Sequence, residues 1–286
     1  MNTSLKKLEQ KRKIQKAILY VLLTICAAYT LFPLLFLFVN SFKGQAEIVK
    51  SPISLPKKWS FEYLATAWDK VNIVSGLINT LIITVSAVAL IVIISSLAAW
   101  VMVRSKSKFS TILFLGFTSA MLIPFQSVMY PLLSIFENLG LKNTFGLILM
   151  YGGFGLSMSV FLYHGFLKSV PKSLEEAAVI DGANIFQLFF KIVFPLVKST
   201  TVTVIILNSM WIWNDYLLPF LVIGNNNTGR TLTLELYFAK MQSGQFGNPW
   251  ELIFPAVFIA MIPIIVLFLC LQKHIVRGVA DGAVKG

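Results

Sequence analysis

The sequence predicts an all-α integral membrane protein with six transmembrane helices and a cytoplasmic helix between the fourth and fifth of them. Of its 286 residues, 57% are hydrophobic and only 13% are charged, whereas an ordinary globular domain carries about 25% charged residues. Several apolar runs reach the length of about 20 residues that a helix needs to cross the hydrocarbon core. A polar segment with helix-forming character separates the fourth run from the fifth.

Six apolar stretches meet the length requirement, although glycine and polar residues interrupt the fourth and fifth, and five or seven spans are alternative counts. The stretches are 17–39, 76–103, 111–133, 145–167, 199–223 and 252–271. Proline within or beside a span is expected to kink the helix, and it occurs at Pro33, Pro124, Pro131, Pro219, Pro255 and Pro263. The first stretch is too long for a cleaved signal peptide and is interpreted as a retained anchor.

The division of the chain follows from these spans. Residues 1–16 form a basic N-terminal segment, 17–271 the transmembrane domain and 272–286 a polar tail, which glycines at 278, 282 and 286 predict to be flexible. With the N-terminus inside, 16 of the 24 lysines and arginines fall in cytoplasmic segments and 8 in external ones. Because basic residues favour the cytoplasmic side, both termini are predicted to be cytoplasmic.

Composition also excludes several function classes. The net charge of +12 does not indicate nucleic-acid binding, because the basic residues are distributed between hydrophobic runs as orientation signals. Cys26 and Cys270 lie in apolar stretches, so neither a disulfide framework nor a thiolate metal site is expected. We expect no catalytic residue and no metal site, since no nucleophile–base or metal-ligand cluster is present. The chain contains no G-x-x-x-x-G-K-[ST] loop for nucleotide phosphates.

The segment 171–195 between the fourth and fifth spans is the most informative part of the sequence. Ser173 and Glu176 have the S-x-x-E spacing of a capping box, which predicts the start of a helix. Leu174, Ala177 and Ala178 are expected to share one face of low profile. A glycine at 182 predicts the helix end, and a second amphipathic stretch runs over 185–193. A solvated linker with one helix packed on lipid is the simpler alternative.

The same segment resembles the EAA loop of ATP-binding-cassette (ABC) importer permeases. That pattern is E-A-A, three residues, G, nine residues and I-x-L-P, and this chain has phenylalanine in place of the leucine at 194. The resemblance implies that this loop contains the coupling helix that docks on a separate ATPase subunit. The residues that it assigns to ATPase coupling are Glu176, Ala177, Ala178, Asp181, Gly182, Ile192 and Pro195.

Other segments are similar to the carbohydrate-uptake branch of that family, specifically to the maltose-type second permease. They include Ser41-Phe42-Lys43, Ile123-Pro124-Phe125-Gln126, Trp213-Asn214-Asp215-Tyr216 and the closing Gly282-Ala283-Val284-Lys285-Gly286. The resemblance implies a multi-pass subunit of a prokaryotic plasma membrane that imports a sugar or oligosaccharide and is not itself an enzyme. An ABC permease for another solute such as glycerol phosphate is the nearer alternative, and a polytopic membrane enzyme or channel is the remote one.

The resemblance also implies the partners. They are a second permease subunit, a dimer of the cytoplasmic ATPase, an extracytoplasmic sugar-binding protein that contacts external loops such as 43–74 and 224–250, and the lipid bilayer. No cofactor is expected on this chain, because ATP and Mg²⁺ would bind the partner ATPase. ATP binding is expected to close the ATPase dimer and move the 171–183 helix, which switches the spans between two states.

A possible substrate path lies on the fifth predicted span. Asn208, Trp211 and Asp215 fall at i, i+3 and i+7 and are expected to share a helix face. Sugars bind to aromatic faces and to planar polar groups, so this face is a candidate for the path. The alternative is that the tryptophan anchors at the membrane interface and Asn208 bonds to a neighbouring helix. The spans hold no further carboxylate, which disfavours a proton-coupled transporter.

Overall fold

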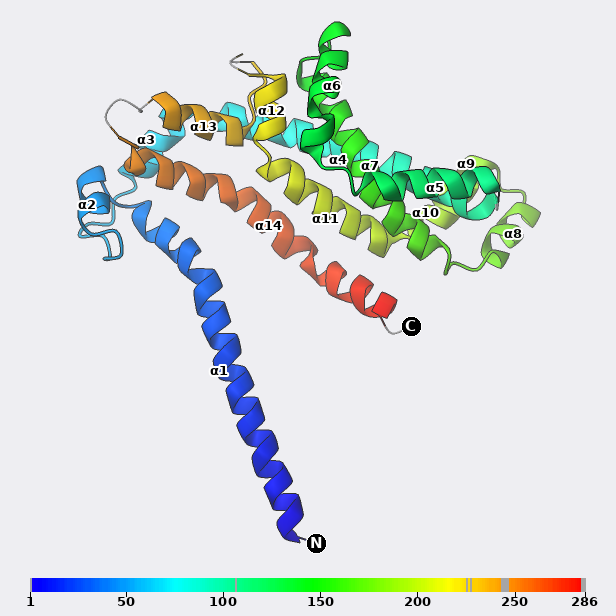
Figure 1. Cartoon of the computed structure of the whole chain (residues 1–286), viewed down its shortest axis with the longest axis horizontal. Coiled ribbons are helices and arrows are strands. Elements are labelled where there is room, and N and C mark those ends of the chain that lie inside the picture. Colours follow the sequence, from blue (N-terminus) through cyan, green and yellow to red (C-terminus); the bar gives the residue numbers. More distant parts are fainter. Residues whose placement is uncertain (1, 106, 225, 227, 243–246, 284–286) are drawn as a thin grey trace. The chain divides into compact units, whose positions relative to one another are not determined.

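The computed structural model describes residues 2–105, 107–224, 226, 228–242 and 247–283 (Figure 1). Helices, turns and loops make up these residues, and no strand occurs among them, which confirms the predicted all-α class. The helices are α1 (Asn2–Asn40), α2 (Gln45–Lys50), α3 (Glu62–Lys70), α4 (Ile73–Ser105), α5 (Lys108–Ala120), α6 (Phe125–Asn138), α7 (Thr144–Leu167), α8 (Ser173–Ile180), α9 (Ile185–Gln187), the π-helix η1 (Leu188–Val193), α10 (Phe194–Leu196), α11 (Lys198–Asn214), α12 (Leu217–Val222), α13 (Leu232–Gln242) and α14 (Trp250–Ala283).

The chain forms two compact units, each described here by itself. Unit 1 comprises residues 1–71 and 239–259, and unit 2 comprises 72–238 and 260–286. In unit 1, Lys43 is fully buried, and its Nζ donates to the carbonyls of Ser51 and Pro52 at 3.1 and 3.2 Å. Burial lowers the pKa of Lys43, and the nearby Glu47 carboxylate opposes that shift. This buried lysine fixes the turn that follows α1.

In unit 2, α4, α7 and α11 pack side by side, and α5 packs against α4 and α7 (Figure 1). The core contains apolar side chains such as Ile83, Ile91 and Leu147, all with no exposed surface. Glycine permits the closest approach between α7 and α4, because a Cβ on Gly155 would lie 2.3 Å from Ile91 Cδ1. Small residues allow helix backbones to pack closely in membranes. The helix pairs of unit 2 therefore form a tight scaffold.

Among the described residues, four helices are long and apolar enough to cross a membrane, and the number rises to six if each of two bent helix pairs is one span. The four are Gln10–Asn40, Ile73–Ser105, Thr144–Leu167 and Trp250–Cys270. They correspond to the first, second, fourth and sixth stretches predicted from the sequence. The third and fifth stretches differ from the prediction of continuous helices.

The predicted span 111–133 is broken between α5 and α6, which lie at 106° to each other. Pro124 stands at the N-cap of α6 in an extended conformation. Proline has no N–H to continue a helix, and it disfavours helical geometry in the residue before it. The chain therefore turns at 121–124. The predicted span 199–223 likewise ends early, because α11 stops at Asn214 and α12 starts only at Leu217.

The polar tail also differs from the prediction. The expectation of a flexible segment over 272–286 is wrong for residues 272–283, because α14 continues to Ala283. A glycine inside a helix costs only about 1 kcal/mol relative to alanine. Two interior glycines are therefore too few to end a helix that has already formed along the preceding apolar run. Residues 284–286 lie outside the described residues.

Candidate functional site

The short helix α8 begins differently from the prediction. Its N-cap is Lys172, and no side chain caps it, so Ser173 and Glu176 do not form the expected capping box. Ser173 already has a helical position, and its hydroxyl is therefore not placed to cap the first turn. The capping box of this segment lies at α9 instead, where Asn184 Oδ1 accepts from the Gln187 N–H at 2.9 Å. In return, the Asn184 N–H donates to Gln187 Oε1 at 3.1 Å.

The end of α8 agrees with the prediction. Gly182 has a φ of +85°, in the left-handed region that favours glycine. Its N–H donates to the Val179 carbonyl at 3.0 Å, and the Ala183 N–H donates to the Ala178 carbonyl at 2.9 Å. These two bonds are the Schellman arrangement, which satisfies the last carbonyls of a helix. Gly182 therefore ends α8 sharply and redirects the chain toward α9.

One residue that the sequence reasoning missed attaches α8 to α4. Glu175 is buried, although it lies beside the exposed Glu176. Its Oε2 accepts from Trp100 Nε1 at 3.0 Å, and its Oε1 accepts from Arg104 Nε at 2.8 Å. Arg104 also donates to the Val170 carbonyl at 3.1 Å. The pairing of Glu175 could have been suspected from Trp100 and Arg104, which are one helical turn apart at the end of an apolar run.

Most of α8 other than Glu175 is open. Val179 and Ile180 are 56% and 85% exposed. The Glu176 side chain is 64% exposed and lies 3.8 Å from Lys172 Nζ. Of the face expected for Leu174, Ala177 and Ala178, the first two residues are exposed and Ala178 is half-buried against the core.

The other predicted coupling residues have different degrees of exposure. Asp181 and Gly182 are exposed in the turn after α8, Ile192 is half-buried in η1, and Pro195 is exposed in α10. The second stretch is helical as expected, but six of its residues form a π-helix. A bend of 77° separates the α9–α10 stretch from α11.

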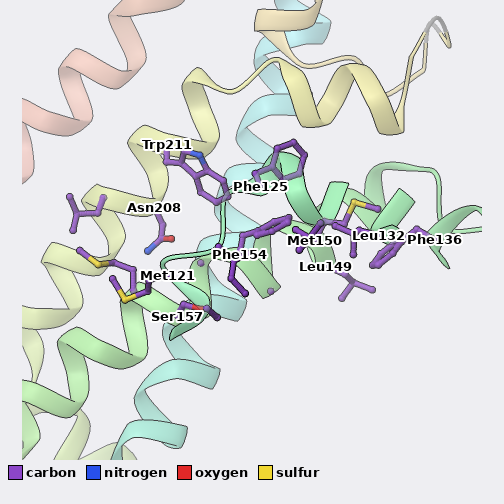
Figure 2. A pocket seen from close by; sticks show the side chains of 17 residues that line it. Met121, Phe125, Leu132, Phe136, Leu149, Met150, Phe154, Ser157, Asn208 and Trp211 are labelled. Carbon is purple, nitrogen blue, oxygen red and sulfur yellow. The ribbon is translucent and has the colours of Figure 1, made fainter. Parts of the chain in front are cut away.

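A pocket of about 730 Å³ lies among the α5–α6 bend, α7 and α11 (Figure 2). Of the predicted path residues, it brings together Asn208 and Trp211. No charged side chain is present among the described residues that line it. They are Ala120, Met121, Ile123, Phe125, Val128, Leu132, Phe136, Leu149, Met150, Gly153, Phe154, Gly155, Ser157, Met158, Leu207, Asn208 and Trp211.

The two path residues in the pocket have different surroundings. Asn208 is 6% exposed, and its Nδ2 donates to Ser159 Oγ on α7 at 3.1 Å and to the Val204 carbonyl at 2.9 Å. Trp211 is 42% exposed. Its ring packs edge-to-face on Tyr151, with the ring centroids 5.3 Å apart. Asn208 therefore holds α11 to α7, while Trp211 presents an aromatic surface to the pocket.

Asp215 does not join them. The expectation that it shares a helix face with Asn208 and Trp211 is wrong, because α11 ends one residue earlier and the backbone of Asp215 is extended. Its Oδ1 accepts from the Leu217 N–H at 2.9 Å, and its Oδ2 accepts from the Tyr151 hydroxyl at 3.0 Å. A carboxylate beside the first N–H groups of a helix stabilises the helix start. Asp215 therefore stabilises the junction between α11 and α12.

Comparison with known proteins gives a family and a fold. Residues 65–281 match the model of the family described as "Binding-protein-dependent transport system inner membrane component". The chain is 41% identical to "Probable starch degradation products transport system permease protein AmyC" of Thermoanaerobacterium thermosulfurigenes, over 96% of this chain and 99% of that protein. It is 34% identical to "Multiple sugar-binding transport system permease protein MsmG" of Streptococcus mutans, over 97% of this chain and all of that protein.

A solved structure shares the fold. It is a chain of a bacterial ABC transporter involved in the import of the acidic polysaccharide alginate, with a TM-score of 0.78 and 22% identity, covering 91% of this chain and 96% of that one. Within the described residues, no group of three or more His, Cys, Asp or Glu side chains could hold a metal ion. The family model and the two relatives show that the chain belongs to the family of binding-protein-dependent transport system inner membrane components and is a membrane transport subunit, not an enzyme.

Proposed function

We propose that this chain is a permease subunit that imports a sugar or oligosaccharide, using ATP hydrolysed by a separate subunit. The observation that carries the substrate class is the agreement among relatives that match nearly the whole chain. The relatives named for starch degradation products and for multiple sugars are joined by a melibiose, raffinose and stachyose import permease of Bacillus subtilis, which is 35% identical over 94% of this chain.

The coupling role rests on α8. The E-A-A segment forms a short helix whose start and end are both fixed, by Glu175 and by Gly182. Its outer side presents Glu176, Val179 and Ile180 to the surroundings. Apolar side chains with this exposure, next to an acidic one, suit docking into a groove of another protein. The partner in this proposal is the ATPase dimer, which binds ATP and Mg²⁺.

The membrane arrangement in this proposal has six spans and cytoplasmic termini, in a prokaryotic plasma membrane. Four spans are single helices, and the bent pair α5–α6 and the α11 half of the second bent pair provide the other two. The excess of basic residues in the segments assigned to the inside supports that orientation. A second permease completes the path, and a sugar-binding protein delivers the solute to the loops 43–74 and 224–250.

The pocket supports a neutral solute. An anionic solute such as glycerol phosphate would favour arginine or lysine in the path, and none is present among the described residues that line the pocket. Trp211 and Phe154 offer aromatic surfaces, and their rings lie edge-to-face at 6.4 Å. Aromatic side chains with a few polar groups are the usual lining of small-molecule sites. We propose Asn208 and Trp211 as path residues, with Asp215 acting through the junction that it stabilises.

The coupling role is tested by purification of the tagged chain from its native membrane, with partners identified by mass spectrometry. Wild type is expected to recover an ATPase and a second permease. Glu176→Lys is expected to lose the ATPase while it stays in the membrane. Glu137→Lys reverses the charge of a glutamate that is exposed to a similar degree on α6, and it is expected to recover the ATPase as wild type does. Wild type that recovers no ATPase would contradict the proposal.

The substrate class is tested by uptake into cells that lack the chromosomal copy. Radiolabelled maltotriose, raffinose and glycerol 3-phosphate are supplied separately. Uptake of either sugar that depends on this chain supports the proposal. Uptake of glycerol 3-phosphate alone would move the chain to the alternative solute class without changing its coupling role.

A further inference from the structure

The attachment of α8 to α4 is concentrated in one side chain. Glu175 accepts two hydrogen bonds from outside its own helix, from Trp100 Nε1 and Arg104 Nε, and its Oε1 also forms an ion pair at 2.7 Å with Arg104 Nη2. Both partner residues belong to the last two turns of α4. The helix α8 also packs against η1. The N-terminal half of α8 is thus bound to α4 by charge and hydrogen bonds.

The attachment is also shielded from water. The side chains of Glu175 and Arg104 are 9% and 18% exposed. A buried carboxylate is costly unless it is paired and fully hydrogen-bonded. Removing one partner of such a pair leaves an unpaired buried charge, so the pair resists separation more strongly than an exposed pair does. Trp100 adds a packed aromatic contact to Phe189 of η1, with ring centroids 5.4 Å apart.

The chain on either side of α8 would otherwise allow α8 to move independently. A turn at 168–172 precedes the helix, and the left-handed Gly182 follows it. By contrast, α4 packs along its length on α7 and also on α11, which carry the pocket residues Phe154 and Trp211. A displacement of α8 reaches α4 directly if α8 and α4 are joined firmly.

We propose that Glu175 is the positioning residue that makes α8 and the end of α4 move as one body when the ATPase changes its nucleotide state. This inference rests on the proposed coupling function of α8. Glu176 contacts the ATPase in that function, whereas Glu175 transmits the resulting displacement into the membrane helices. The two neighbouring glutamates therefore have separate tasks, docking and transmission.

The test measures the distance between α8 and α4 in the assembled complex. Spin labels are placed at Lys172→Cys and at Val101→Cys, whose native side chains are both more than half exposed. The background carries Cys26→Ser and Cys270→Ser, because both cysteines are exposed. Pulsed electron paramagnetic resonance records the distance distribution without nucleotide and with ATP plus vanadate. The variants are Glu175→Ala, the milder Glu175→Gln and the control Glu137→Gln, at an exposed glutamate on α6 that lies outside the docking surface.

We expect one narrow distance in the labelled parent chain and in Glu137→Gln, with no change on nucleotide addition. In Glu175→Ala the distance should shift or broaden when ATP and vanadate are added, although the ATPase is still recovered. Glu175→Gln should change in the same direction by less. An unchanged, narrow distance in Glu175→Ala would overturn the inference, and so would loss of the ATPase from Glu175→Ala, because Glu175 would then be needed for assembly. A parent chain that recovers no ATPase would instead refute the proposed function, and the inference with it.

Discussion

The α8 region and the α7–α11 region differ in where their polar and apolar side chains find contacts. Between α7 and α11, polar groups find partners within the chain, as Asn208 does with Ser159 and as the Tyr163 hydroxyl does with Thr201 Oγ1 at 2.9 Å. On α8, only Glu175 is buried, and the apolar Val179 and Ile180 face outward. The first region is held together by hydrogen bonds within the subunit. The second has an inner side fixed by the chain and an outer side that is suited to a partner.

This difference indicates where substitutions should act. Changes between α7 and α11 should alter the stability of the isolated subunit, because its own contacts are lost. Changes on the outer side of α8 should alter assembly and leave stability nearly unchanged. Four substitutions test this distinction, each with a control from the same chain.

The largest effect on stability is expected from Gly155→Ala on α7. The added Cβ would lie 2.3 Å from Ile91 Cδ1 and 2.7 Å from Asn208 Oδ1. Overpacking of this kind typically costs about 1–3 kcal/mol. Gly153→Ala is the matched control on the same helix, because its Cβ would meet nothing within 4 Å. Unfolding of the purified subunits in detergent should show a lower midpoint for Gly155→Ala only. Equal midpoints for the two variants would show that the Ile91 and Asn208 side chains can shift to make room for the methyl group.

A somewhat smaller effect is expected from Gly182→Ala, and the quantity that should change is the recovery of the ATPase with the purified chain. Alanine in the left-handed conformation costs about 1–2 kcal/mol, although the space around Gly182 is open. The end of α8 should fray and the recovery of the ATPase should fall. Gly182→Asn should recover more ATPase than Gly182→Ala, because asparagine tolerates this conformation better. Gly165→Ala, at an open helical position, should recover it fully. Full recovery in Gly182→Ala would show that docking does not need this turn.

Much of the architecture follows from local patterns in the sequence. Apolar length predicts four of the spans, and Gly182 predicts the end of α8, because each depends on a physical property of neighbouring residues. The breaks at Pro124 and after Asn214 are harder to predict. A proline in an apolar run is compatible with either a kink or a complete turn, and tertiary packing decides between them.

The candidate site likewise combines features that local sequence patterns predict with features that depend on tertiary packing. The E-A-A spacing identifies α8, but it directs attention to Glu176, whereas burial, two hydrogen bonds and an ion pair distinguish Glu175. That distinction depends on Trp100 and Arg104, which are more than 70 positions away in the sequence. Asp215 illustrates the opposite error, because the sequence pattern included it in a helix face that it does not share. Helical spacing placed it beside Trp211, and the end of α11 removed it from that face.

The third effect is expected at Asn208. Hydrogen bonds between membrane helices contribute about 0.6 kcal/mol on average. Asn208→Ala should therefore lower the free energy of unfolding by about that amount, and the double variant with Ser159→Ala should lose little more than the single ones. Trp211→Ala is the comparison, because this side chain lines the pocket while 42% exposed. It should reduce sugar uptake more than it reduces stability. Unchanged uptake in Trp211→Ala would remove this residue from the path.

The smallest effect is expected from Lys172→Ala, which removes the exposed partner of Glu176. The two charged groups lie 3.8 Å apart with more than half of each side chain exposed, and such pairs contribute about 0.3–0.5 kcal/mol. Their order along the helix, with lysine before glutamate, is also the less favourable one. Unfolding midpoint and ATPase recovery should both stay close to wild type. Arg104→Ala removes a buried partner from the neighbouring carboxylate and should lower the midpoint clearly. If Lys172→Ala and Arg104→Ala had the same unfolding midpoint, the burial of Glu175 would not distinguish the inner side of α8 from its outer side.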